Sequence, residues 1–174
     1  RDRYLPIHIK GGMEIHVQDL VSGLVERGHK VTVITASHPQ KNEYEEKKEN
    51  LTIFYLKSKP KYTRERFYRE SAELFRRLNR REKFDVIHSQ STLALGYVKY
   101  CTKDIPLVIT MHGTALNEIK TVLKGNSSLK YFFAIPLWLK NYLFDDRLIL
   151  RKADKVIAVS NELKRDIERQ YRII

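Results

Sequence analysis

Two neighbouring glycines are the first residues whose type and position could do chemistry. Gly11 and Gly12 stand directly before an amphipathic segment. Glycine lets a backbone come close to a ligand, and the free N–H groups at a helix start favour an anion. A tight turn accounts for the pair equally well, so both interpretations stay open at this point. The three spaced glycines of a dinucleotide fingerprint are missing, and no acidic residue ends the next apolar run, which disfavours NAD binding.

A histidine with a glycine beside it is the second candidate. Met111, His112, Gly113 and Thr114 directly follow an apolar run at residues 106–110. Ligands of open parallel sheets bind outside the carboxyl ends of the strands. The position therefore predicts that His112 lies at the edge where ligands bind, with room provided by the glycine. The structural alternative is a histidine at a strand end that bonds a nearby carbonyl.

Two further histidines are weaker candidates. His88 ends the apolar run at residues 84–88, so it belongs to the same expected edge. His16 lies one turn into the first helix, where it could face a crevice or solvent. None of the six histidines has the spacing of a metal site, and Cys101 has no base signalled near it. The sequence predicts no metal, no cofactor and no activated nucleophile.

Apolar periodicity defines the elements that must position these residues. The spacing of Val17, Leu20, Val21 and Leu24 predicts a helix that Gly28 ends. Short β-branched runs predict strands, longer apolar stripes predict helices, and Ser160 is expected to cap the last helix. The strands are expected at 30–36, 51–56, 84–88, 106–110 and 155–159, the later helices at 63–81, 93–100 and after 160, and loops at 37–50 and 120–128.

This alternation predicts an α/β fold, a Rossmann-like, doubly wound parallel sheet with helices on both faces in three layers. A strand should precede the first helix, but residues 1–10 hold early charges and a proline and supply a poor one. We expect the first strand to be missing from this chain and to lie upstream. Residues 1–174 otherwise suit one domain.

Composition sets the class of protein. Hydrophobic residues make up 42% and charged residues 31%, which excludes a disordered chain, and the net charge is +12. The lone cysteine excludes a disulfide scaffold, and no secretion signal is visible, so a cytoplasmic location is expected. Abundant Lys, Glu and Arg with few glycines would suit a thermophile.

Five segments in order along nearly the whole chain resemble one family. They resemble family 4 of the retaining GT-B glycosyltransferases, specifically its N-terminal domain. The segments are residues 11–17, 20–35, 84–88, 110–114 and 151–162.

The resemblance implies two Rossmann-like domains that face a cleft, one for the acceptor and one for a nucleotide-sugar donor. This chain corresponds to the acceptor-binding domain, with the C-terminal donor domain absent, and would be inactive alone. Sugar transfer would retain the anomeric configuration without an enzyme nucleophile. The resemblance places Gly11 and Gly12 at the donor phosphates and His112, as a catalytic residue, near the donor sugar. It places at the acceptor or cleft Glu14, His16, His88, Gly113, Thr114 and Ser160.

Two segments could meet a membrane. Residues 61–83 hold nine basic and four acidic residues on an expected amphipathic helix, which could dock on anionic lipid or simply cover the sheet with a solvated basic face. Residues 129–144 begin with the most apolar stretch. They could form an acceptor wall, a membrane-inserting edge or a surface covered by the missing domain. The charged pair Asp145 and Asp146 is expected at the solvated surface.

The net charge of +12 supports an alternative function, a non-catalytic module that binds polyanions such as nucleic acid or anionic lipid. Nucleic acid is the less favoured partner, because the chain has no recognised nucleic-acid motif and its aromatic residues follow core spacing.

Overall fold

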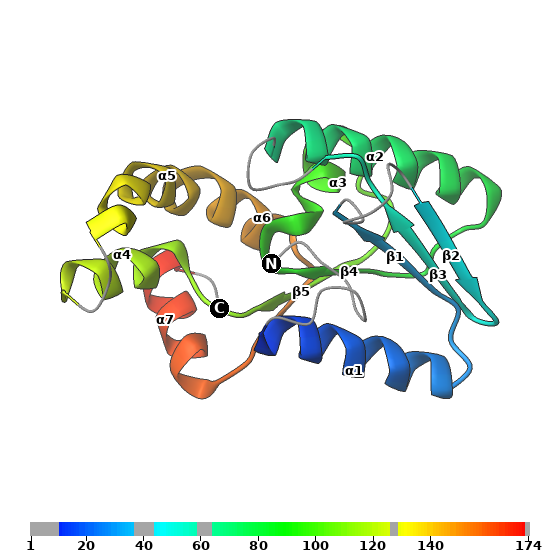
Figure 1. Cartoon of the computed structure of the whole chain (residues 1–174), viewed down its shortest axis with the longest axis horizontal. Helices are drawn as coiled ribbons and strands as arrows, with labels where there is room; N and C mark the ends of the chain where they lie inside the picture. The colour runs from blue at the N-terminus through cyan, green and yellow to red at the C-terminus, as the bar shows by residue number, and fades with distance from the viewer. Residues whose placement is uncertain (1–10, 37–43, 59–63, 126–128, 173–174) are drawn as a thin grey trace. The chain divides into compact units, whose positions relative to one another are not determined.

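The structure is a computed structural model that describes residues 11–36, 44–58, 64–125 and 129–172. The chain divides into two compact units, Arg1–Glu82 and Lys83–Ile174. Each unit has its own three-stranded sheet with helices (Figure 1). The α/β class and the Rossmann-like alternation are confirmed. Residues 1–10, on which the prediction of a missing first strand rests, lie outside the described residues. That prediction and the single domain over 1–174 stay predictions.

Unit 1 is a mixed sheet between two helices. The strand order is β1-β3-β2, with β1 parallel and β2 antiparallel to β3. In Figure 1, α1 and α2 run along opposite sides of this sheet, as a doubly wound fold requires. The elements are α1 (Gly12–Glu26), β1 (Val31–Thr35), β2 (Tyr44–Lys48), β3 (Leu51–Tyr55) and α2 (Arg64–Arg81).

The core of unit 1 follows the period of two along its strands. Val21 of α1 packs with Ile53 and Tyr55 of β3, and all three side chains are buried. Alternate residues of a strand point to opposite faces, so these two belong to the α1 face. Gly28 follows the helix with a φ of 81°, a left-handed conformation that glycine adopts without strain. The predicted end of the first helix is therefore confirmed.

The strand β2 corrects the sequence-based expectation of a loop over 37–50. Residues 44–48 read Tyr-Glu-Glu-Lys-Lys, which has no apolar alternation and so gave no strand signal. Lys48 pairs with Leu51, so only Glu49 and Asn50 lie between the strands, and this hairpin holds the segment in place. A charged strand is typical of a sheet edge, where charge discourages pairing with another chain.

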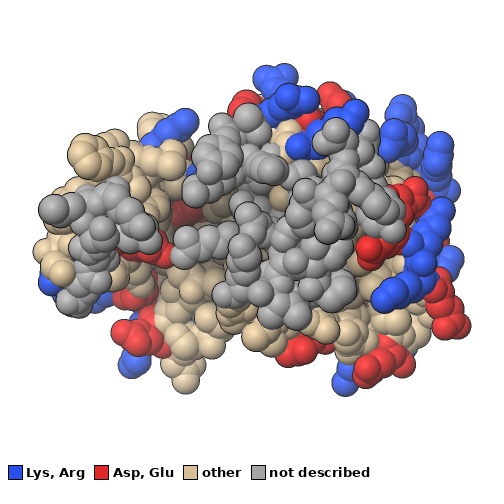
Figure 2. Space-filling model, in the orientation of Figure 1, with Lys and Arg blue, Asp and Glu red and all other residues tan. Residues whose placement is uncertain are grey.

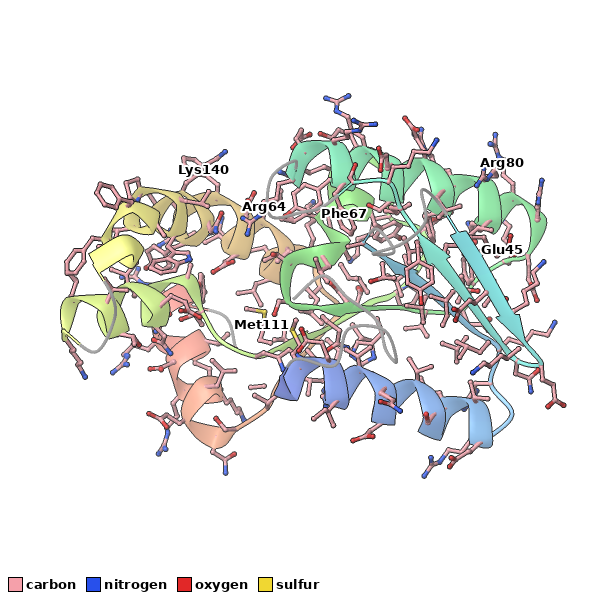
Figure 3. The ribbon with its side chains drawn as sticks, viewed as in Figure 1. Glu45, Arg64, Phe67, Arg80, Met111 and Lys140 are labelled. Carbon is pink, nitrogen blue, oxygen red and sulfur yellow. The ribbon has the colours of Figure 1, made fainter. Side chains whose placement is uncertain are left out.

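The basic helix α2 buries its apolar side in the core of unit 1. Phe67 is 2% exposed and Leu74 is 7% exposed. Phe67 points inward, whereas Arg80 projects away from the ribbon (Figure 3). The apolar face predicted at 63–81 is confirmed, and its burial leaves a charged outer face.

Unit 2 is built on a fully parallel sheet with the order β4-β5-β6. Its core contains Leu107 and Ile109 of β5 with Ile149, all of them completely buried. The first part of the unit consists of β4 (Ile87–Gln90), η1 (Ser91–Ala94), α3 (Leu95–Tyr100), β5 (Leu107–Met111) and α4 (Ala115–Leu123). The second part consists of η2 (Leu129–Ala134), α5 (Ile135–Lys140), η3 (Asn141–Asp145), α6 (Asp146–Lys152), β6 (Lys155–Ala158) and α7 (Asn161–Tyr171).

Two boundaries in unit 2 differ from expectation. The strand expected at 84–88 lies at Ile87–Gln90, because parallel pairing with β5 continues through three polar residues that carry no strand signal. The loop expected at 120–128 is wrong as far as Leu123, which belongs to α4. Residues 126–128 of that loop lie outside the described part of the chain.

The acidic pair Asp145 and Asp146 is buried, at 8% and 5% exposed, so the prediction of a solvated pair is wrong. Asp145 bonds Lys99 Nζ at 3.3 Å. Asp146 accepts from the Tyr171 hydroxyl at 2.6 Å and from Ala115 N at 3.3 Å. These partners come from distant parts of the chain and compensate for the loss of hydration. The residues next to Asp145 and Asp146 in the sequence do not indicate these partners.

Candidate functional site

The carboxyl edge of the sheet in unit 2 gathers several of the predicted residues. The strands β4, β5 and β6 are parallel, so their carboxyl ends meet at one edge. His112 is the first residue after β5 and is half-buried. Ser160 follows β6 by two residues, on the same edge. The position that the sequence predicted for His112 is the one the structure gives it.

Two cross-strand polar pairs lie side by side on β4 and β5. Gln90 Oε1 is 2.8 Å from His112 Nε2, and His88 Nε2 is 2.8 Å from the Thr110 hydroxyl. Thr110 lies two residues after Val108, the register partner of His88, and His112 lies two residues after Thr110, the register partner of Gln90. All four side chains project from one face, since residues two apart in a strand share a face.

The amide oxygen of Gln90 can only accept a hydrogen bond. His112 Nε2 therefore donates to Gln90, and this contact fixes both the ring orientation and the position of one proton. Gln90 was not among the predicted site residues. Its position could have indicated a role. Gln90 lies two residues after His88, where the family that this chain resembles often has a second histidine.

The turn after β4 carries backbone strain. Ser91 has a φ of 52°, in the left-handed region that residues other than glycine rarely occupy. The hydroxyl of Ser89 supports this turn, since it donates to Ser91 O at 2.9 Å and accepts from Ala94 N at 2.9 Å. Strained residues of this kind concentrate at functional sites. Apart from a run of small polar residues, nothing in the sequence indicates this strained turn.

Thr114 anchors the segment that follows His112. Its hydroxyl accepts from Asn117 N at 3.2 Å, which caps α4, and donates to Gln170 Oε1 of α7 at 2.8 Å. Asn117 in turn donates to Asp166 at 2.7 Å, and this bond is the main cause that holds the pKa of Asp166 below its usual value. A Cβ at Gly113 would meet no atom within 4 Å. The segment is thus tied down at Thr114 and has open space at Gly113.

Ser160 caps α7, as predicted, by accepting from Leu163 N at 3.1 Å, and its side chain is exposed. Asp154, in the same family-like segment, lies at the other end of β6. Its carboxylate accepts from Leu107 N at 2.7 Å, and this bond, followed by the Lys103 contact, lowers its pKa. Asp154 therefore joins the starts of β5 and β6 and serves the sheet rather than the edge that carries His112.

The glycine motif lies at the start of α1 in unit 1. Gly11 is fully extended, a conformation open to any residue, and a Cβ at Gly12 would meet nothing within 4 Å. Glu14 is buried, and its Oε2 would lie only 3.3 Å from a Cβ at Gly11. The carboxylate thus lies beside the helix start, where the helix dipole favours a negative charge. His16 is half-buried on the next part of α1.

The described residues contain no cluster of three or more histidine, cysteine or acidic side chains that could hold a metal ion. Among the same residues, no helix is both long and apolar enough to cross a bilayer.

The sequence is similar to that of one known protein family. Residues 10–174 match the family described as Glycosyltransferase Family 4. Because the match extends over almost the whole chain, this protein belongs to that family, and the fold is that of the N-terminal half of a GT-B glycosyltransferase.

Two relatives are similar over part of their lengths. The uncharacterized glycosyltransferase MJ1178 of Methanocaldococcus jannaschii is 24% identical over 161 residues, which cover 91% of this chain and 39% of the relative. A human relative, named as a subunit of phosphatidylinositol N-acetylglucosaminyltransferase, is 31% identical over 86 residues, 48% of this chain and 18% of the relative. The chain therefore spans less than half the length of either relative.

Proposed function

We propose that this chain is the acceptor-binding domain of an enzyme that moves a sugar from a nucleotide-sugar donor to an acceptor, with retention. A role in glycosyl transfer follows from the family match over residues 10–174, which is the observation that carries the proposal. The finer statements about donor, acceptor and stereochemistry are inferences from the resemblance and from the chemistry of the residues.

The geometry in unit 2 is compatible with such a reaction. His112 lies at the carboxyl edge with its ring held by Gln90 and with open space at Gly113. A leaving nucleoside diphosphate gains negative charge in the transition state, and positioned N–H donors can stabilise that charge without a metal. In the proposal, His112 faces the donor sugar. His88, Gly113, Thr114 and Ser160 belong to the walls of the acceptor cleft.

In unit 1 the proposal places donor phosphates at the start of α1. The open space over Gly12 would admit a phosphate oxygen to the free backbone N–H groups. Glu14 would have to move aside, because two negative charges at one helix start repel each other. His16, on the following turn, is assigned to the cleft.

The domain alone is proposed to be inactive, since it covers only 39% of MJ1178 and the donor-binding half is expected elsewhere. Nucleotide sugar and acceptor are the proposed substrates, with no metal or other cofactor, and the proposed location is cytoplasmic. The name of the human relative contains a membrane lipid, phosphatidylinositol, which supports a lipid-bearing acceptor. A thermophilic source is proposed from the Lys, Glu and Arg content, and a melting temperature would test it.

The decisive experiment compares this chain with the longer protein that also carries a C-terminal glycosyltransferase half. Both are incubated with UDP- and GDP-sugars and a membrane-lipid extract, and sugar transfer is measured. The proposal expects transfer only with the longer protein and retention of the anomeric configuration in the product. Full transfer by the 174 residues alone would show that this chain is not an acceptor-binding half. An inverted product would contradict retention.

A further inference from the structure

Exposed apolar side chains gather in one part of unit 2. Of the eleven large hydrophobic side chains that are exposed among the described residues, seven lie between residues 123 and 144. Phe133 is 88% exposed and Phe144 is 64% exposed. Six of the seven form what we call the apolar stripe, which consists of Phe132, Phe133, Leu137, Leu139, Leu143 and Phe144.

The apolar stripe follows helical spacing along η2, α5 and η3. Within the stripe, Leu137 and Phe144 lie four and eleven residues after Phe133. Leu139 and Leu143 lie seven and eleven residues after Phe132. Such intervals bring side chains to one face of a helix. The three elements follow one another without a break.

Among the described side chains of α5 and η3, the two buried ones are polar, while Ile135, Trp138 and Tyr142 are half-buried. Asn141 and Asp145 are 7% and 8% exposed, and Asp145 bonds Lys99. A helix on a water-facing surface normally directs its apolar side inward and its polar side outward. Here large apolar side chains lie on the exposed side as well, and both fully buried side chains of η3 are polar. An apolar face of this kind that points outward marks a surface that something covers.

The charges around the stripe indicate what covers it. Residues 119–144 contain four lysines and no acidic residue. Lys140, which follows Leu139 of the stripe in the sequence, projects away from α5 (Figure 3). A lysine can keep its ammonium group at a polar, anionic level while its stem lies along apolar material. Asp145 and Asp146, which follow Phe144, are buried, so lysine supplies the charge along the exposed side of this segment. Exposed phenylalanine and leucine together with lysine are typical of segments that lie in the interface of an anionic bilayer.

The basic helix α2 offers charge without this apolar component. Its apolar side, which includes Phe67, Ala72 and Leu74, is buried in the core of unit 1. Figure 2 shows charged side chains over α2 and β2, and mostly uncharged ones over α5. An anionic surface could attract α2, but α2 has no free apolar face to insert.

We propose that the apolar stripe docks this protein on the surface of an anionic lipid bilayer, with Phe133 and Phe144 inserted and Lys140 at the headgroups. The stripe lies in the interface and does not cross the bilayer, in line with the finding that the described residues contain no spanning helix. The inference goes beyond sugar transfer, since a domain without catalytic activity would dock in the same way.

The test measures binding of the protein that carries this chain to vesicles by sedimentation. Vesicles of phosphatidylcholine alone are compared with vesicles of phosphatidylcholine and phosphatidylglycerol in equal parts. We expect binding to the anionic vesicles only. The double variant Phe133→Ser/Phe144→Ser should lower the partition coefficient at least about tenfold, because two inserted rings are lost. Lys140→Gln should lower it about fivefold.

Two controls keep the outcome specific. Val86→Ser removes an exposed apolar residue of unit 2 that lies outside the stripe, and binding should be unchanged. Arg76→Gln/Arg80→Gln removes two charges of α2 and should weaken binding less than the double phenylalanine variant. Circular dichroism confirms that every variant is folded.

Several results would overturn the proposal. Unchanged binding of the double phenylalanine variant would exclude insertion of the stripe. A larger loss with the α2 variant would assign the contact to the basic helix. Equal binding to neutral vesicles would exclude recognition of anionic lipid. If the unmodified protein fails to bind vesicles and dimerises, and the double variant is monomeric, a second copy covers the stripe instead.

Discussion

The two units of this protein distribute polar and apolar side chains in different ways. Among the described residues, unit 1 exposes one large hydrophobic side chain, Ile15, whereas unit 2 exposes ten. Unit 1 buries four polar or charged side chains and unit 2 buries seven. Unit 2 also has more described residues, so buried polar side chains are about equally frequent in the two units, and the real difference lies in the exposed hydrophobic side chains.

The buried polar and the exposed apolar side chains of unit 2 have different physical consequences. Burial of a polar group costs free energy unless the group is hydrogen-bonded. The buried polar side chains of unit 2 therefore need hydrogen-bond partners inside the unit. Thr114, Gln170, Asp146 and Tyr171 form such contacts between α4, α6 and α7. These contacts hold the segment that follows His112. The exposed apolar side chains do not stabilise the isolated unit and point to a partner surface. Unit 2 therefore combines a hydrogen-bonded edge next to His112 with an exposed apolar stripe.

The variant Asp146→Ala tests most directly whether unit 2 depends on its buried polar contacts. It leaves the Tyr171 hydroxyl and Ala115 N without their acceptor, and should lower the free energy of unfolding by about 3 kcal/mol. The matched change in unit 1, Glu45→Ala on the exposed strand β2, should cost less than about 0.5 kcal/mol. Urea unfolding followed by fluorescence of Trp138, the single tryptophan, reports on unit 2, and circular dichroism reports on the whole chain. If both variants lower the free energy of unfolding equally, unit 2 does not depend on the buried contacts of Asp146.

The variant His112→Ala tests whether the reacting edge belongs to unit 2. In the longer protein with a donor-binding half, it should lower kcat/KM for sugar transfer about a hundredfold, because a positioned polar contact to the reacting sugar is lost. His16→Ala in unit 1 should lower kcat/KM by a clearly smaller factor. Steady-state transfer assays give both values, and a larger loss for His16→Ala would reverse the assignment.

The variant Gln90→Leu tests whether Gln90 orients the ring of His112 at this edge. It removes the acceptor for His112 Nε2, so the ring loses its orientation and kcat should fall roughly tenfold with little change in KM. Gln90→Glu keeps an acceptor oxygen and should preserve most activity.

A second measurement separates positioning from a merely structural role. Nitrogen-15 NMR of the histidine rings should show a redistribution of the His112 tautomers in Gln90→Leu. Thr110→Val should instead change the signals of His88, which Thr110 contacts. Unchanged His112 signals in Gln90→Leu would contradict the positioning role.

The smallest expected effect concerns pH. Burial, reinforced by the charge of Asp146, raises the pKa of Tyr171 well above its usual value of about 10. Tyr171 therefore supports the folded state below pH 10, and this support is lost as the pH rises, because only the unfolded tyrosine ionises readily. Tyr171→Phe should cost about 1 kcal/mol at neutral pH and reduce the loss of stability above pH 10. Urea titrations between pH 7 and 11 measure both. An unchanged alkaline slope would contradict this role.

The sequence predicted much of the fold and part of the site. Periodicity gave α1 and its end at Gly28, the buried face of α2 and the cap at Ser160, since each depends on residues close together in the chain. The position of His112 after β5 followed from one rule about parallel sheets. The strand β2 was missed because its pairing with β3, rather than its own residues, makes it a strand.

The sequence by itself determined the family, the alternation of strands and helices, and the place of His112 at a strand end. Only the tertiary structure decided that Asp145 and Asp146 are buried, that Gln90 holds His112, and that the apolar stripe faces outward. The reason is physical. A local sequence pattern depends only on the residues close to a side chain in the chain. Burial and hydrogen bonding depend on partners such as Lys99, Tyr171 and Thr114, which folding brings from distant parts of the chain.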